Sequence, residues 1–199
     1  MELSNTERRI FAKGTANFRR MGKAGWQTFV ISAVVCSLAM GTQAQSAGEY
    51  QVKAAFLFNF AKFVEWPAGS FPDASAPLQI CVLGRDPFGE ELRSITNEKL
   101  VNGRKLEVHQ VADLQHARSC HILFVASSGK TPVKQIVEAL RGTSVLTVGD
   151  TKGFAEQGGM INFVLESDRV QFEVSCKAAE QAGLKISSKL LSVAKLVIV

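Results

Sequence analysis

The chain has 199 residues, of which 46% are hydrophobic and 21% are charged, and its formal net charge is +5. This length and apolar content suit one ordinary α/β domain and exclude a globally disordered chain. Most of the positive charge lies at the N-terminus. Residues 1–26 carry six basic and two acidic side chains, which leaves 17 basic and 16 acidic side chains for the remainder. A nearly neutral body excludes a strong general affinity for nucleic acid, so we expect no nucleic-acid partner.

The N-terminal segment has the three parts of a secretory signal peptide. Its basic stretch is followed by 12 uncharged, mostly apolar residues at 29–40 and then by the small-residue exit Gly41-Thr-Gln-Ala44. We therefore predict cleavage after Ala44, with Ser46 and Ala47 as alternatives. The apolar run is short for the ~20 residues that an uncleaved membrane anchor requires.

Two consequences follow from this signal peptide. The chain divides into a signal peptide at 1–44 and a mature domain at 45–199, which works in the periplasm, where disulfides persist. The sequence leaves open whether translation starts at Met1 or at Met21.

The mature chain opens with a predicted aromatic helix over residues 50–66, which Pro67 ends. Val52, Phe56, Phe60 and Phe63 recur at helical spacing, so this stripe is assigned to the core. Leu57 and Phe58 lie off the stripe and are the predicted partner surface, because exposed apolar side chains of this kind mark interfaces. The alternative is a helix buried on two sides.

Alternating strands and helices then predict a parallel sheet. After it, two alternating strands indicate an antiparallel hairpin, and two C-terminal helices follow, split at Gly183. The predicted strands are 78–83, 105–111, 121–126, 144–148, 160–166 and 170–174, and the predicted helices between them are 87–97, 112–118 and 132–140. Asp86 is the expected N-cap of the first of these helices, and the final helix is expected to begin at Ser187 or Ser188 and to bury Leu190, Leu191, Ala194, Val197 and Ile198. The expected fold is α/β: a single three-layer, Rossmann-like domain with a mostly parallel sheet of about six strands, a C-terminal antiparallel hairpin and helices on both faces.

Motifs of the common enzyme and cofactor sites are incomplete in this sequence. The turn Gly84–Gly89 lacks the Lys-Ser/Thr of a P-loop and is followed by Glu90 and Glu91, which would repel a phosphate. Ser127-Ser128-Gly129 lacks the first glycine of a nucleophile elbow. His109, His116 and His121 match no common metal-ligand spacing. We therefore expect a non-enzymatic protein without a metal or a cofactor.

Three cysteines remain after the predicted cleavage. Cys81 lies in the first predicted strand and Cys120 opens the third, and in a sheet of order 2-1-3-4 these strands are neighbours, so a disulfide between them is sterically feasible. Three buried thiols are the alternative. Cys176 is the odd cysteine, and we expect it to be a free thiol.

Several blocks of the mature chain resemble the YfiR-like family of periplasmic proteins. The resemblance covers about residues 49–197 and implies a disulfide between Cys81 and Cys120. The blocks are Tyr50-Gln-Val-Lys-Ala-Ala-Phe-Leu-Phe-Asn-Phe-Ala-Lys-Phe-Val-Glu-Trp-Pro67, Ile80-Cys-Val-Leu-Gly-Arg-Asp-Pro-Phe-Gly89, Cys120-His-Ile-Leu-Phe-Val125, Gly158-Gly-Met-Ile-Asn-Phe163 and Ala182-Gly-Leu-Lys-Ile-Ser-Ser-Lys-Leu-Leu191. A second cysteine pair of the family has no counterpart, since residues 144–159 contain no cysteine.

The resemblance implies a regulator of an inner-membrane signalling protein such as a diguanylate cyclase, acting from the periplasmic side in cyclic-di-GMP signalling. An outer-membrane lipoprotein is the implied second partner, and a homodimer is left open. The alternative function is a periplasmic small-molecule binding protein, whose ligand cleft would lie at the carboxyl ends of the parallel strands. The residues expected in that cleft are Gly84, Arg85, Asp86, Ser127, Ser128 and Asp150.

Overall fold

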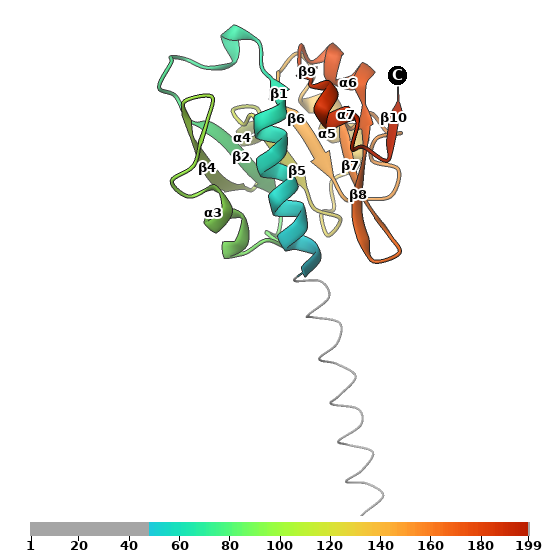
Figure 1. Ribbon diagram of the computed structural model, residues 1–199. Helices are drawn as coiled ribbons and strands as arrows, with labels where there is room; N and C mark the ends of the chain where they lie inside the picture. The colour runs from blue at the N-terminus through green and yellow to red at the C-terminus, as the bar shows by residue number, and fades with distance from the viewer. Residues whose placement is uncertain (1–47, 199) are drawn as a thin grey trace, which may run out of the picture. The chain divides into compact units, whose positions relative to one another are not determined.

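An eight-stranded sheet with helices packed against both faces organises the protein, of which the computed structural model describes residues 48–198 (Figure 1). The strand order is β10-β8-β7-β6-β5-β2-β4-β3. The pairs at the centre are parallel, whereas β7–β8 and β3–β4 are antiparallel. The strands are β2 (Leu78–Leu83), β3 (Leu100–Val101), β4 (Arg104–Val111), β5 (Ile122–Val125), β6 (Leu146–Gly149), β7 (Ile161–Glu166), β8 (Arg169–Ser175) and β10 (Leu196–Ile198). The predicted α/β class, the strand order 2-1-3-4 (as β4-β2-β5-β6) and the hairpin are confirmed.

A helix over residues 48–63 crosses one face of this sheet (Figure 1). It leads into β1 (Val64–Glu65), which pairs with β9 (Lys185–Ile186) in a separate two-stranded sheet. The remaining helices are η2 (Ala68–Ser70), α3 (Glu90–Thr96), α4 (Leu114–Ala117), α5 (Val133–Ala139), α6 (Cys176–Gln181) and α7 (Ser188–Leu191). No helix in this part of the chain is long and apolar enough to cross a membrane.

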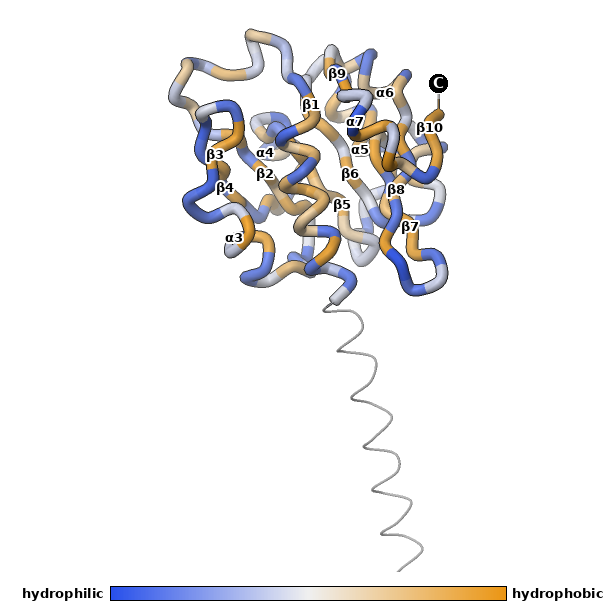
Figure 2. Tube along the Cα trace, viewed as in Figure 1, coloured by the Kyte–Doolittle hydropathy of each residue, from blue (hydrophilic) through white to orange (hydrophobic). Residues whose placement is uncertain are grey.

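The two faces of the sheet carry separate hydrophobic cores, because successive strand residues point to opposite sides. On β5, Ile122 and Phe124 join the core under the helix over residues 48–63, whereas Leu123 and Val125 join the core under α4 and α5. Figure 2 shows the resulting pattern, with apolar residues along the central strands and hydrophilic residues at the β7–β8 turn. This arrangement is the three-layer domain that the sequence predicts.

A buried phenylalanine accounts for two glycines, Gly149 at the end of β6 and Gly159 of the family block 158–163. Phe154 is fully buried, and a Cβ placed on Gly149 or Gly159 would collide with its ring. Only glycine therefore lets the segment after β6 fold back tightly against the start of β7.

The structure differs from the sequence prediction in three main respects. The sheet has eight strands rather than about six, because β3 and β10 were not expected. The predicted last helix ends at Leu191, and the β-branched Val197 and Ile198 extend the sheet beside β8 instead. The first helix gives way to β1 before Pro67. The predicted signal peptide at 1–44 lies outside the described residues.

Candidate functional site

The helix over residues 48–63 buries a different stripe from the one predicted. Leu57 is fully buried, like Phe60, whereas Val52, which the periodicity assigned to the core, is 44% exposed. The prediction that Leu57 lies on the surface is therefore wrong. The buried stripe of the helix runs through residues 53, 57 and 60, with Ala54 and Ala61 beside it. The charge of Lys53 at its start hid this register from the hydrophobic pattern.

Phe58 is the predicted surface residue that keeps an accessible side. It is half-buried, and two lysine ammonium groups lie over its ring: Nζ of Lys99 at 4.9 Å and Nζ of Lys62 at 5.6 Å from the centroid. Lys62 and Lys99 are both exposed. Leu100 follows Lys99 on the edge strand β3 and is 61% exposed. We call Phe58, Lys62, Lys99 and Leu100 the Phe58 surface; it combines apolar area with positive charge.

The carboxyl ends of β5 and β6 hold a buried polar cluster. The carboxylate of Asp150 accepts hydrogen bonds from Nζ of Lys53 at 2.8 Å, from the Tyr50 hydroxyl at 2.9 Å and from the Ser127 backbone N–H at 2.7 Å. Nζ of Lys53 also pairs with Glu49 at 2.5 Å. The side chains of Lys53 and Asp150 are 5% and 3% exposed. The cluster ties the start of the helix to the sheet.

Burial, together with the neighbouring carboxylates, keeps the Tyr50 phenol protonated. Burial, followed by the negative charge of Asp150 and the hydrogen bond to it, raises the pKa of the Tyr50 phenol above its ordinary value. Tyr50 therefore stays neutral and donates to Asp150 throughout the physiological pH range. Lys53 is not among the predicted site residues, although its place on the same helix face as Leu57 and Phe60 is a signal of a buried, paired lysine.

The ligand cleft expected at these carboxyl ends stays a prediction, and several of its polar groups are already bonded within the protein. Asp150 and Ser127 belong to the polar cluster. Asp86 accepts a hydrogen bond from the Phe88 backbone N–H at 2.8 Å and forms an ion pair with Arg93 at 3.5 Å. It therefore stabilises the turn before α3. The prediction that Asp86 is the N-cap of this helix is wrong, because the N-cap is Gly89. Gly84, Arg85 and Ser128 are exposed around this edge.

Cys81 and Cys120 form a disulfide that joins β2 to the turn just before the neighbouring strand β5. Their Cα atoms lie 6.0 Å apart, within the ordinary range for such bonds. Both residues are buried in the core under α4 and α5. Cys176 is a free thiol at intermediate exposure, and burial raises its pKa, so it is a poor nucleophile.

The three histidines are spread over separate elements. His109 lies on β4 and His116 on α4, both with exposed side chains, whereas His121 is buried just before β5. His121 Nδ1 accepts the Gln79 N–H at 3.1 Å, and Nε2 donates to the Ser70 carbonyl at 3.1 Å. Burial lowers the pKa of His121, so the ring is neutral and ties the loop after the helix to the sheet. Among the described residues, no three His, Cys, Asp or Glu side chains come together as a metal site.

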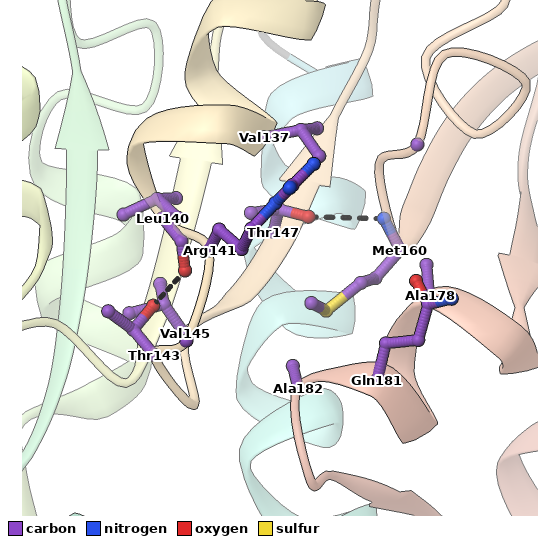
Figure 3. A pocket seen from close by; sticks show the side chains of 12 residues that line it. Val137, Leu140, Arg141, Thr143, Val145, Thr147, Met160, Ala178, Gln181 and Ala182 are labelled. Carbon is purple, nitrogen blue, oxygen red and sulfur yellow. Dashed lines mark hydrogen bonds between the residues drawn. The ribbon is translucent and has the colours of Figure 1, made fainter.

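A small pocket lies between α5 and α6 (Figure 3). Its volume is about 130 Å³, and its wall includes Met160, whose backbone N–H donates to the Thr147 hydroxyl at 3.1 Å. The Thr143 hydroxyl donates to the Leu140 carbonyl at 2.6 Å. Because these polar groups already have partners, the pocket offers mainly apolar contact.

A comparison with protein-family models assigns the chain to a family. A family model described as YfiR/HmsC-like matches residues 50–195. The chain belongs to the YfiR/HmsC-like family. The matched range contains the aromatic helix, the disulfide, the hairpin and the polar cluster except for Glu49. The predicted resemblance is confirmed.

Comparisons with curated proteins and with solved structures give no further assignment. A search of curated proteins gives no significant match. Two solved structures share 14% identity with the chain, each over 60% of its length: a conserved domain protein from Vibrio cholerae O1 biovar eltor, with a TM-score of 0.47, and an ABC domain in complex with L-Trp from Streptococcus pneumonia, with a TM-score of 0.45. The chain covers 54% and 55% of those two structures, respectively.

Proposed function

We propose that this protein is a periplasmic, non-enzymatic regulator that binds the periplasmic part of an inner-membrane signalling protein. Membership of the YfiR/HmsC-like family carries the proposal, since that family consists generally of non-catalytic regulators. The partner we propose is a diguanylate cyclase whose output is cyclic-di-GMP, and an outer-membrane lipoprotein is the second proposed partner. The Cys81–Cys120 disulfide supports an oxidising compartment such as the periplasm.

The Phe58 surface is the proposed contact with the membrane protein. Phe58 supplies a half-buried aromatic anchor, and Leu100 supplies exposed apolar area on an edge strand. Lys62 and Lys99 favour a partner segment with an acidic side chain next to an apolar one. Such a contact acts by shifting an equilibrium: the regulator binds one arrangement of the partner more tightly and so increases its population.

Deletion of the gene tests the proposed output. Cellular cyclic-di-GMP, measured by mass spectrometry, should rise in the deletion strain and return to the parental level when the wild-type gene is restored. An unchanged level in the deletion strain would overturn the proposed repression of a cyclase.

A further inference from the structure

Besides the pocket between α5 and α6, a cleft lies at the opposite end of the parallel strands from the polar cluster. It lies where β5 and β6 begin and has a volume of about 430 Å³, within the usual range of small-molecule sites. Three segments form it: the loop after the first helix, the turn before β5 and the loop before β6. We propose that this cleft binds a small organic molecule through a carboxylate group.

The charge of the lining favours an anion. Among the residues that line the cleft, Arg118 is the one with a permanent charge, and none is Asp or Glu. Nη1 of Arg118 is anchored on the Ala139 carbonyl, which uses one of its five N–H donors. The remaining donors of this exposed guanidinium can bind a carboxylate through two parallel hydrogen bonds.

Four hydroxyl side chains also line the cleft, those of Ser70, Ser119, Thr143 and Ser144. Two of them already donate within the protein, Ser119 to the His116 carbonyl and Thr143 to the Leu140 carbonyl. Within residues 48–198, the Ser70 hydroxyl oxygen is shielded from solvent and has no hydrogen-bond partner. A buried hydroxyl without a partner costs free energy, so rotation of the Ser70 side chain toward the cleft would let it donate to a ligand oxygen.

The remaining lining supports an organic body rather than inorganic phosphate. Pro67 and Val145 give the cleft apolar wall, and a single arginine provides less charge than a phosphate dianion normally collects. The walls are also held in place before any ligand binds. His121 joins Ser70 to β2 through both ring nitrogens, and the disulfide joins Cys120 to β2. Preorganisation of this kind reduces the entropy cost of binding.

Isothermal titration calorimetry of the purified protein with benzoate tests the proposal, with benzamide as the uncharged isostere and inorganic phosphate as the alternative anion. We expect saturable benzoate binding that is stronger than binding of either benzamide or phosphate. Equal binding of benzoate and benzamide, or no saturable binding of benzoate, would overturn the carboxylate site. Tighter binding of phosphate would overturn the organic ligand class.

Two variants assign the binding to this cleft. Arg118→Gln should weaken benzoate binding by at least about tenfold, the effect of losing a charge-assisted hydrogen bond. Ser70→Ala should weaken it severalfold while leaving the melting temperature unchanged, because the Ser70 hydroxyl has no bond to lose within the described residues. Arg141→Gln is the matched control, since Arg141 is an exposed arginine that lines the other pocket. Unchanged benzoate affinity in both Arg118→Gln and Ser70→Ala would contradict the assignment of binding to this cleft. The assay needs no protein partner, so its outcome is independent of the proposed function.

Discussion

Leu57, Phe58 and Phe60 lie within about one turn of the same helix, yet they occupy two different environments. Leu57 and Phe60 are fully buried, and Phe60 packs against Phe163 and Phe172 with ring centroids 5.7 and 5.2 Å apart. Phe58 is half-buried between two exposed lysines. Substitutions here therefore separate stability from binding.

Alanine substitutions in this turn should fall into two classes. Phe60→Ala should lower the free energy of unfolding by about 3–5 kcal/mol and Leu57→Ala by about 2–5 kcal/mol, because each leaves a cavity in the core. Phe58→Ala should cost about 1 kcal/mol of stability but weaken partner binding by about 1–3 kcal/mol. Thermal melts and binding of the partner's periplasmic segment measure the two effects. Early melting of Phe58→Ala, matching Phe60→Ala, would place the partner surface elsewhere.

Lys53 and Asp150 form the ion pair that fastens the first helix, and both are almost fully buried. Lys53→Met should lower the free energy of unfolding by about 3–5 kcal/mol, because it leaves the Asp150 charge buried without its cation. The double variant with Asp150→Asn should lose less than the sum of the two single losses. Lys62→Met, on the exposed side of the same helix, is the control and should stay within about 0.5 kcal/mol of the parent in urea unfolding. Additive losses would show that the pair is not coupled.

At the scale of elements, the sequence predicts the interior of the fold better than its edges. The strands β2, β5 and β6 are short, mostly apolar runs bounded by turn residues, so their position and order followed from the sequence. The edge strand β10 was mistaken for the end of a helix, because three residues carry no usable periodicity and the pairing with β8 is a tertiary effect. The register of the first helix was missed for a related reason, since Lys53 is buried only through its partner Asp150, nearly a hundred residues later in the chain.

The disulfide joins two elements that are distant in sequence. It closes a loop of 39 residues between β2 and β5, for which loop-closure entropy predicts about 3–4 kcal/mol of stabilisation. Cys81→Ser should lower the free energy of unfolding by about 2–5 kcal/mol. Cys176→Ser, which removes the free thiol, should leave it unchanged. Peptide mapping without reductant should recover the Cys81 and Cys120 peptides joined, and recovery of both with free thiols would refute the bond in the native protein.

At the scale of the whole molecule, export comes first. The 12-residue apolar run at 29–40 is short for a membrane anchor, so residues 1–44 should be absent from the protein in the periplasm. N-terminal sequencing of the periplasmic fraction should begin at Gln45 or within a few residues of it. Full-length protein retained in washed inner membranes would contradict cleavage.

The most direct test of the regulator account is photocrosslinking in living cells. A benzophenone amino acid in place of Leu100, beside Lys99 on the Phe58 surface, should give an adduct in the inner-membrane fraction. The crosslinked peptide, identified by mass spectrometry, should come from a periplasmic segment of a diguanylate cyclase. The same probe in place of Glu138, which is exposed on α5 over the opposite face of the sheet, should give no such adduct. Adducts with a membrane protein from position 138 alone, or from neither position, would contradict the account.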